Sequence, residues 1–370
     1  MKKVTILALH LGFGGGEKSI VNLANGLSYE YEVEIISVYK LYEKSAFPIN
    51  DNVKVRYLIK EKPNREKIKE CIMTKDVINL FKEVCYAISV LYKRKKYMMR
   101  AIRECDSDII ISSRILFSNW VRVNKKKNIK IGWEHNHHKN NKKFIKRLVK
   151  SARNVNSLVT VSSRLASFYQ GYIKNCEVYF IPNIVEEQSN YSKLNNDNIV
   201  TVGRLEYEKG YMELIDVFNE ILKEKPNCKL HIVGDGSQRR SLEDKVNEYG
   251  ICDNVIFHGY QSTEYINDLL ISQSVFVMTS YQESFGIVLV EAMNKGIPCV
   301  AFDSAEGACE IIKNGCNGYL IPDRDKFLMA QGILKLLNDN NLRIKMGKNA
   351  LFVGKKFISK EVVRQWKKLF

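Results

Sequence analysis

Residues 4–27, VTILALHLGFGGGEKSIVNLANGL, contain an apolar run, three successive glycines and a helical repeat. The apolar run predicts a buried strand, and the repeat of Ile20, Leu23, Ala24 and Leu27 predicts a helix. Glycines between a strand and a helix let the backbone approach a ligand, and the free N–H groups at the helix start attract an anion. A plain tight turn has the same pattern, so the loop alone leaves both interpretations open.

The spacing of this loop is close to that of a nucleoside triphosphate-binding loop, but one residue argues against that function. Gly12 and the pair Lys18–Ser19 have the required separation, whereas Glu17 stands where glycine is needed before the lysine. Its carboxylate would lie in the path of the phosphates. Gly14, Gly15 and Gly16 are therefore candidates for contact with another kind of anionic ligand.

The composition is that of a globular protein long enough for two α/β domains. The chain has 370 residues, of which 45% are hydrophobic and 27% charged. Nine cysteines without a CxxC pair argue against a zinc site or a disulfide framework and predict a reduced, cytoplasmic protein. The first apolar run is short and lacks a cleavage-like site, so we interpret it as a strand rather than a signal peptide. No apolar stretch reaches transmembrane length.

An alternation of strands and helices runs through the chain twice. In the first half, short apolar strands are interrupted by helices, and residues 64–104 predict basic helices. The polar segment 186–198 lacks periodicity and predicts a linker, after which the pattern restarts with NIVTVGRL at 198–205. Alternating strands and helices imply parallel sheets. We therefore expect an α/β fold of two Rossmann-like domains, residues 1–182 and 183–355, that face one cleft.

Residues at strand ends carry the most weight, because ligands of open parallel sheets bind beyond the carboxyl ends of the strands. In the segment 203–210, GRLEYEKG, Gly203 and Arg204 end a predicted strand and Lys209 precedes a helix. Arginine and lysine at one strand end suit a diphosphate, although a solvated loop has a similar composition.

The segment 281–296, YQESFGIVLVEAMNKG, places two glutamates around the start of a helix. Glu291 interrupts an apolar helix, where a buried carboxylate is costly unless it accepts hydrogen bonds, and sugar hydroxyls are suitable donors. Glu283 lies just before the helix, whose first N–H groups have no partner within the helix. A helix cap and one exposed helix position would explain the same two residues without a ligand.

Five motifs together resemble those of the family 4 glycosyltransferases of the GT-B fold: GFGGGEKS (12–19), GRLEYEKG (203–210), GDGSQ (234–238), ESFGIVLVE (283–291) and NGYLIPDRD (317–325). The resemblance covers most of the chain. It implies a retaining transferase that moves a sugar from a nucleotide-sugar, expected to be a UDP-sugar, to a lipid-linked or glycan acceptor in the synthesis of cell-surface polysaccharide such as capsule. It also implies that the C-terminal helix, 356–370, packs back on the first domain.

By motif position, the resemblance assigns roles to individual residues. Arg204 and Lys209 would hold the diphosphate, Glu283 would contact the donor-sugar hydroxyls, and Glu291 would bind the ribose. Further donor contacts are expected from backbone, from a residue near the nucleobase and from the two glycine loops: Phe285, Gly286, Ile287, Tyr260, Gly14, Gly15, Gly16 and Gly203. The segment 306–312, EGACEII, departs from the Gly-Pro or Gly-Gly that the family commonly has there, so Glu310 is assigned no role.

The first domain matches the family less closely. The family often has a histidine at a strand end near the reacting sugar, and in WEHNHH, residues 133–138, His135 is the candidate. The resemblance thus gives four candidate catalytic residues: His135, Glu283, Arg204 and Lys209. His135 and His137 share a face of an extended segment, but no further ligand is evident, so we expect no metal and no cofactor. Two Asp-x-Asp strings, 106–108 and 323–325, are interpreted as strand-start and turn residues.

The resemblance also implies a mechanism without a metal. Arg204, Lys209 and the helix start at Phe285 would stabilise the charge of the departing nucleoside diphosphate. No carboxylate is evident as a nucleophile on the far face of the sugar. The acceptor would then attack on the face from which the diphosphate leaves.

Positive charge is concentrated in one quarter of the chain. Of a net charge of +17, residues 60–150 account for +16, with 25 Lys and Arg against 9 Asp and Glu. We expect this region to bind an anionic membrane surface at the inner face of the plasma membrane, with Lys93–Lys96 beside Tyr92, Tyr97, Met98 and Met99.

Three alternatives to this interpretation stay open. Solvated helix faces would also explain the charge. A nucleic-acid-binding protein would explain it too, but the region lacks a recognised nucleic-acid motif, so we expect no nucleic-acid partner. A GT-B protein without catalysis, acting as an interaction module, would keep the fold and lose the activity.

Overall fold

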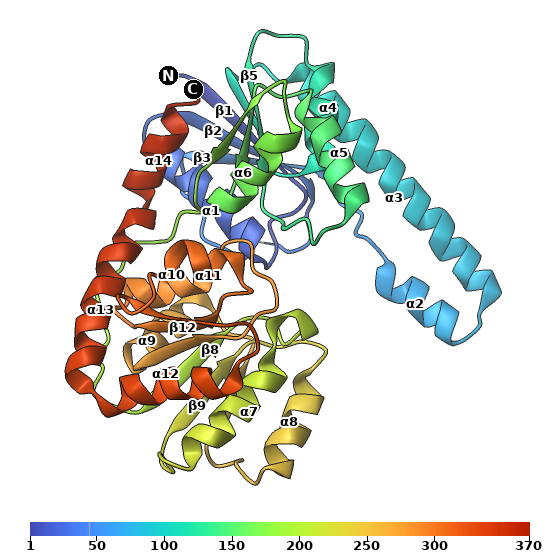
Figure 1. Cartoon of the computed structure of the whole chain (residues 1–370). Coiled ribbons are helices and arrows are strands. Elements are labelled where there is room, and N and C mark those ends of the chain that lie inside the picture. The colour runs from blue at the N-terminus through green and yellow to red at the C-terminus, as the bar shows by residue number, and fades with distance from the viewer. Residues whose placement is uncertain (44) are drawn as a thin grey trace. The chain divides into compact units, whose positions relative to one another are not determined.

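The structure, a computed structural model, describes residues 1–43 and 45–370. Contacts divide the chain into two compact units, here called the first domain (Met1–Ile181 with Val363–Phe370) and the second domain (Pro182–Val362). Each contains one parallel sheet with helices packed on it (Figure 1). The C-terminal segment is shared, because helix α14 (Ser359–Lys367) begins in the second domain and ends in the first.

The first domain has a seven-stranded sheet of order β3-β2-β1-β4-β5-β6-β7, in which all paired strands are parallel. Its strands are β1 (Lys3–Ala8), β2 (Glu32–Tyr39), β3 (Val53–Ile59), β4 (Ile109–Ser112), β5 (Ile129–Glu134), β6 (Ser157–Thr160) and β7 (Glu177–Phe180). Its helices are α1 (Gly15–Leu27), α2 (Arg65–Met73), α3 (Val77–Glu104), α4 (Ile115–Trp120), α5 (Lys142–Ala152) and α6 (Ser163–Tyr172), with a 3₁₀ turn, η1 (Val121–Val123).

The second domain repeats this plan with a six-stranded sheet of order β10-β9-β8-β11-β12-β13, again parallel. Its strands are β8 (Asn198–Val202), β9 (Lys229–Val233), β10 (Val255–Gly259), β11 (Val275–Met278), β12 (Cys299–Phe302) and β13 (Gly318–Ile321). Its helices are α7 (Tyr211–Leu222), α8 (Arg239–Glu248), α9 (Thr263–Ile271), α10 (Ile287–Asn294), α11 (Glu306–Ile311), α12 (Lys326–Asn338) and α13 (Asn340–Gly354), with 3₁₀ turns η2 (Tyr207–Lys209) and η3 (Lys355–Phe357).

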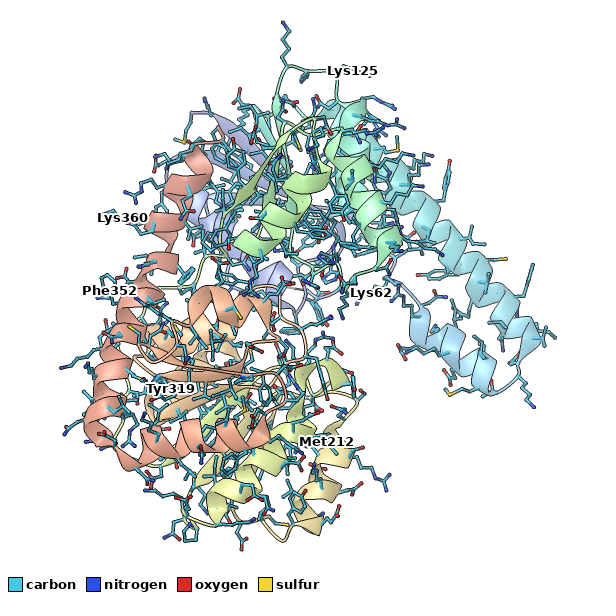
Figure 2. All side chains as sticks on the ribbon, viewed as in Figure 1. Lys62, Lys125, Met212, Tyr319, Phe352 and Lys360 are labelled. Carbon is cyan, nitrogen blue, oxygen red and sulfur yellow. The ribbon has the colours of Figure 1, made fainter. Side chains whose placement is uncertain are left out.

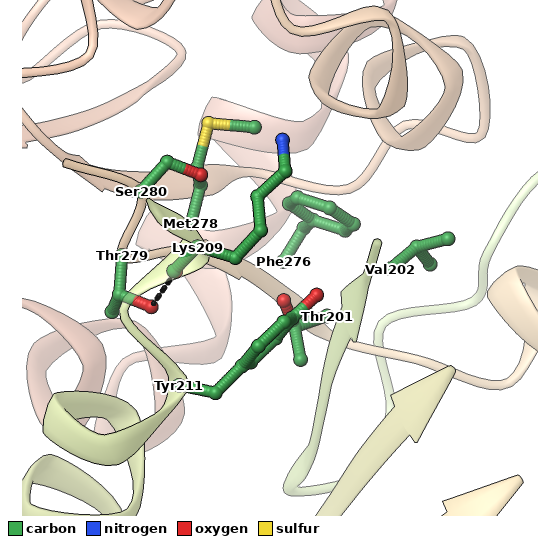
Figure 3. A pocket seen from close by; sticks show the side chains of 8 residues that line it. All are labelled: Thr201, Val202, Lys209, Tyr211, Phe276, Met278, Thr279 and Ser280. Atoms are coloured by element: carbon green, nitrogen blue, oxygen red, sulfur yellow. Dashed lines mark hydrogen bonds between the residues drawn. The ribbon is translucent and has the colours of Figure 1, made fainter. Parts of the chain in front are cut away.

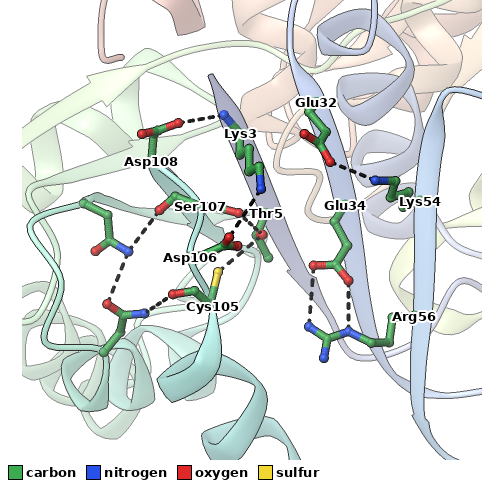
Figure 4. A network of polar contacts seen from close by, with 12 residues as sticks. Lys3, Thr5, Glu32, Glu34, Lys54, Arg56, Cys105, Asp106, Ser107 and Asp108 are labelled. Carbon is green, nitrogen blue, oxygen red and sulfur yellow. Dashed lines mark hydrogen bonds and ion pairs between the residues drawn. The ribbon is translucent and has the colours of Figure 1, made fainter. Parts of the chain in front are cut away.

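The pattern of two sheets is confirmed, and strand β3 is the element that the apolar pattern missed. β3 lies at the edge of its sheet and is interrupted by Lys54 and Arg56, so it lacks the continuous apolar run of a central strand. Lys54 pairs with Glu32 at 2.8 Å and Arg56 with Glu34 at 2.9 Å across to β2 (Figure 4). β1, by contrast, is buried from Val4 to Ala8.

The Asp-x-Asp strings have structural roles, as the sequence predicts. The backbone N–H of Lys3 donates to Asp108 at 2.8 Å, and the Lys3 ammonium pairs with Asp106 at 3.3 Å (Figure 4). Asp325 caps helix α12 by accepting from the backbone N–H of Leu328 at 2.9 Å. Both strings therefore fix the start of an element.

The strand order sets where each domain can bind a ligand. It reverses direction between β1 and β4 in the first sheet and between β8 and β11 in the second. At such a switch point the loops that leave the two strands run to opposite faces of the sheet and open a crevice at its carboxyl edge. The segments that follow β1, β4, β8 and β11 are therefore the places to look for a site.

Helices α2 and α3 form an arm that extends away from the sheet of the first domain (Figure 1). The C-terminal half of α3 is anchored, because Val90, Met98, Ala101 and Ile102 are buried in the core with β2 and β3. The N-terminal half packs against α2 and carries several exposed side chains (Figure 2). In the part of the chain that the structure describes, no helix is both long and apolar enough to cross a bilayer.

Candidate functional site

The carboxyl edge of the second sheet brings together two of the predicted catalytic residues. The Lys209 ammonium donates to Glu283 Oε2 at 2.6 Å, and both side chains are about four-fifths shielded from solvent. Lys209 ends the turn η2 after β8, and Glu283 lies in the loop after β11. The pair therefore spans the switch point of this sheet, where a ligand crevice is expected.

Arg204 lies near this edge but is not part of the pair. Its guanidinium is 70% exposed and contacts Glu208 at 3.1 Å. Gly203, directly before it, leaves room for the Tyr211 hydroxyl, which would lie 2.8 Å from an added Cβ. Arg204 is thus exposed and paired with a neighbouring side chain, while Lys209 is held at the switch point by Glu283.

A small cavity lies beside Lys209 (Figure 3). It is lined by Thr201 and Val202 of β8, by Tyr211 of α7, by Phe276 and Met278 of β11, and by Thr279 and Ser280. The backbone carbonyl of Lys209 accepts from the Thr279 hydroxyl at 3.0 Å, which ties the two switch-point loops together. Burial raises the pKa of the Tyr211 phenol, so it stays protonated near neutral pH.

The start of helix α10 is shaped by glycines. Gly286 caps the helix with a positive φ of 83°, which glycine adopts without strain. Gly307 lies against the loop: an added Cβ would be 2.2 Å from the Phe285 carbonyl oxygen, and its N–H donates to the Glu283 carbonyl at 2.8 Å. The Phe285 side chain is buried and packs on Phe357, with ring centroids 5.5 Å apart. Phe285 can therefore offer a ligand only its backbone.

Three further predicted donor contacts differ in their exposure. Glu291 is half-buried on α10, because the helix is short and one side of it reaches the surface. Tyr260 follows β10 and is more than half exposed. Ile287, the first residue of α10, is half-buried.

The glycine loop of the first domain is folded around a buried carboxylate. Glu17 is buried in α1, and the Arg114 guanidinium donates to it at 2.9 Å. An added Cβ on Gly14 would be 2.3 Å from Glu17 Oε2, and Gly14 has a φ of 155°. Gly15 is exposed and Gly16 half-buried at the start of the helix. The loop therefore needs glycine at position 14 because Glu17 turns back over it.

His135 lies at this edge, directly after β5. The Cγ of its ring would be 4.0 Å from an added Cβ on Gly16, and the ring packs on Trp133 with centroids 4.1 Å apart. Part of the residue is exposed, but both ring nitrogens are buried, and neither has a hydrogen-bond partner among the described residues. Burial, with a smaller effect of the Arg114 charge, lowers the pKa of His135 to about 3. His135 is thus a neutral imidazole with unused polar atoms.

The neighbouring histidines have other partners. His138 stacks on Phe168 with centroids 4.1 Å apart, and its Nδ1 accepts from the backbone N–H of Asn140 at 3.0 Å. His137 Nδ1 accepts from the N–H of Lys139 at 2.9 Å. Among residues 1–43 and 45–370, no group of three His, Cys, Asp or Glu is arranged to hold a metal ion.

Sequence reasoning missed Arg114, Glu134 and Gly307 as site residues. Arg114 follows β4 by two residues and Glu134 ends β5, so the rule about strand ends had the information to find both. Burial raises the pKa of Glu134, which accepts from the backbone N–H of Asn136 at 2.9 Å. Gly307 gave no local signal, because its contact with Phe285 joins residues from different loops.

Comparison with known proteins defines the class. The fold is that of the GT-B glycosyltransferases: the structure of a Staphylococcus aureus TarM mutant in complex with fondaparinux, α-GlcNAc-glycerol and UDP superposes with a TM-score of 0.80 over 100% of this chain and 99% of that one, at 16% identity. Residues 183–351 match the model of the family described as glycosyl transferases group 1. This match lies within the second domain and covers less than half of the chain.

Two curated relatives align along the whole chain. An α-1,4-N-acetyl-D-galactosaminyltransferase of Campylobacter jejuni, which acts on an undecaprenol-linked glycan by its name, is 26% identical over 100% of this chain and 98% of its own length. An exopolysaccharide phosphotransferase of Streptomyces coelicolor is 28% identical over 100% of this chain. The match covers 40% of that longer protein.

Proposed function

We propose that the protein is a retaining, metal-independent glycosyltransferase that moves a sugar from a UDP-sugar to a lipid-linked or glycan acceptor in polysaccharide synthesis. One observation carries the proposal: the ion pair between Lys209 and Glu283, made at 2.6 Å at the switch point of a group 1 domain. An ion pair that is largely shielded from solvent costs desolvation energy for both charges, so its presence at a ligand crevice favours a role in binding.

The two members of the pair act on different parts of the donor. A diphosphate that reaches Lys209 competes with Glu283 for the ammonium, and Arg204 adds a second cation from an exposed position. Glu283 is then released to accept hydrogen bonds from the donor sugar. The N–H groups at the start of α10 add positive potential as the diphosphate leaves.

This set of charges supports the proposal of metal independence. Lys209, Arg204 and the start of α10 supply the positive potential that a divalent cation supplies elsewhere. The cations belong to the protein, so no ion has to be recruited with the donor. Glu291, half-buried on the same helix, binds the ribose hydroxyls.

His135 contributes as a neutral hydrogen-bonding group. Its buried nitrogens have no partner among the described residues, which is costly unless a ligand supplies one. A sugar hydroxyl both donates and accepts, and it suits an imidazole whose low pKa keeps it uncharged.

The relatives support the choice of donor and acceptor classes. The TarM complex contains UDP, and the C. jejuni enzyme is named for an undecaprenol-linked acceptor. The +16 charge of residues 60–150 agrees with a lipid-linked acceptor, because it would hold the enzyme at an anionic inner membrane face.

Transfer is tested with purified protein, a panel of UDP-sugars and lipid-linked glycan acceptors. UDP release and the mass of the acceptor are the two measurements. We expect UDP release with at least one donor and an acceptor mass increased by one sugar, with retained anomeric configuration by NMR. Folded protein that binds no UDP and releases none from any donor would contradict the proposal.

A further inference from the structure

The arm of the first domain carries an exposed apolar face that the transferase reaction does not use. On α3, Val77, Phe81, Val84, Ile88 and Leu91 are three or four positions apart and therefore share one side of the helix. All five are exposed, with Val77 at 74%, Phe81 at 70% and Ile88 at 61%. Apolar side chains in a continuous exposed row mark a surface that meets another apolar phase.

The row is wide and has no charge inside it. Ile78, Cys85 and Tyr92 flank it on one side and are exposed as well. At the tip of the arm, Ile72 and Met73 of α2 add two more exposed apolar side chains. From Val77 to Tyr92 the face is about 24 Å long at 1.5 Å per residue.

The same face becomes basic where α3 approaches the domain. Lys95 lies one turn beyond Leu91 and Lys96 one turn beyond Tyr92, and both are exposed. The Lys96 ammonium lies 5.9 Å from the centre of the Tyr92 ring. An apolar face that ends in an aromatic ring and two lysines matches the profile of an interfacial helix, which places its side chains in acyl chains and its lysines at headgroups.

The acidic residues in and just before this part of α3 do not lie in its apolar face. Glu83 is half-buried and accepts from the Asn64 side chain at 2.6 Å, on the side of α3 that faces α2. Asp76 caps the start of α3 by accepting from the Asn79 N–H at 3.0 Å. Glu66 pairs with Lys69 at 3.0 Å on α2. Repulsion of an anionic surface by these carboxylates is therefore limited.

We propose that the arm inserts this face, residues 77–92 of α3 with Ile72 and Met73, into the headgroup region of a bilayer rich in anionic lipids. The inference rests on the proposed function only for the reason to dock, which is a lipid-linked acceptor. The test of docking does not depend on that function. Charge complementarity selects the occupant: residues 60–150 carry +16, which attracts an anionic surface and repels a second copy of the chain. A helical dimer seam would also have charged flanks of both signs, whereas these flanks are Ile78, Cys85 and Tyr92.

The arm also corrects the segment expected from the sequence. Met98 was expected at the interface beside Lys93–Lys96, but it is fully buried against the domain core. Lys93 forms an ion pair with Glu61. The apolar contribution comes instead from the preceding four turns of α3, because these extend beyond the edge of the sheet.

The test is sedimentation of the full-length protein with vesicles of phosphatidylglycerol or of phosphatidylcholine. The variant Phe81→Ser/Ile88→Ser removes the centre of the face. The matched control is Phe327→Ser on α12 of the second domain, where Phe327 is 69% exposed, as Phe81 is 70% exposed. We expect wild type and control to bind phosphatidylglycerol vesicles. We expect the double variant to bind at least about tenfold more weakly, because its apolar contact is lost.

Insertion is measured separately with Phe81→Trp and Phe327→Trp and brominated lipids, which should quench the first tryptophan and leave the second unchanged. Equal vesicle binding by wild type, Phe81→Ser/Ile88→Ser and Phe327→Ser would show that the arm is not the docking element. Absence of vesicle binding by wild type at low salt would overturn docking altogether. A wild-type dimer by light scattering that the double variant abolishes would show that a second copy covers this face, and would also overturn the proposal. Binding of UDP, followed as a shift in melting temperature, shows separately whether the transferase proposal stands.

Discussion

The carboxyl edges of the two sheets are built on one plan and differ in the groups that they leave for a ligand. At the edge of the second domain, here called the charged edge, Lys209 and Glu283 form an ion pair. At the edge of the first domain, here called the neutral edge, Glu17 is paired with Arg114, and the ring nitrogens of His135 have no partner among the described residues. His135 is neutral because burial lowers its pKa to about 3. We therefore expect the charged edge to take a diphosphate and the neutral edge to contact hydroxyl groups.

The largest effect is expected from Glu283→Gln, which removes one charge from the charged edge. The change keeps the shape but removes the charge that balances Lys209, which is also the charge that we propose to contact the donor sugar. We expect turnover to fall about 100-fold or more, because the contact tightens in the transition state. Steady-state kinetics with a UDP-sugar measure it.

The matched control for this variant is Glu220→Gln, which disrupts an exposed pair with Lys223 on α7. It should leave turnover unchanged. Near-normal turnover of a folded Glu283→Gln protein would show that the assignment of Glu283 is wrong.

A smaller effect is expected from Gly307→Ala, which keeps every charge and moves the loop that holds Glu283. Its Cβ would lie 2.2 Å from the Phe285 carbonyl oxygen, so the loop has to shift. We expect a loss of stability of about 1–3 kcal/mol and a fall in turnover of about tenfold. Gly171→Ala is the control, because nothing lies within 4 Å of its added Cβ. Unchanged kinetics and melting temperature for both variants would argue against a role for the close packing at Gly307.

The neutral edge predicts a pH dependence of stability. The folded pKa of His135, about 3, is below the ordinary value of 6.5, so the unfolded state binds a proton more readily between these values. This contribution is absent above pH 6.5 and destabilises the fold as the pH falls below it. At pH 5 it amounts to about 2 kcal/mol, from a gap of about 1.5 pH units.

His135→Phe should remove this part of the acid sensitivity. Chemical denaturation at pH 7.5 and pH 5 measures it in wild type and variant. An equal loss of stability on acidification in both proteins would mean that His135 is charged in the fold at pH 5, and the contrast between the edges would fail.

The smallest effect is expected from chelation. If Lys209, Arg204 and the start of α10 supply the positive potential at the diphosphate, transfer should proceed unchanged in EDTA. UDP release with and without EDTA measures it. Loss of activity that magnesium or manganese restores would contradict metal independence.

The two edges also differ in how far the sequence predicted them. In the second domain, Lys209 and Glu283 belong to local motifs near strand ends, and these motifs identified each residue as a candidate, although not the ion pair between them. In the first domain, Gly14 was recognised, but its reason was not: Glu17 turns back over it and is held by Arg114, which is 97 residues away in the chain. Long-range contacts of this kind leave no periodic signal in the sequence.

The fold was predicted more fully than the site because periodicity reports burial, and central parallel strands are buried on both faces. The apolar periodicity failed to predict β3, because Lys54 and Arg56 interrupt this edge strand. It also could not tell which apolar positions of a long helix are covered: Met98 is buried and Phe81 exposed, although both lie in α3. Exposure depends on where the sheet ends, which local sequence does not encode.

The most direct test of the central claim, that Lys209 at the charged edge holds a nucleotide diphosphate, is calorimetric titration of UDP in EDTA. Wild type, Lys209→Met and the control Lys223→Met, whose exposed lysine pairs with Glu220 at 2.7 Å, are compared. We expect wild type and control to bind UDP equally. We expect Lys209→Met to bind at least about tenfold more weakly, equivalent to roughly 1.4 kcal/mol. Equal affinity in all three proteins would contradict it.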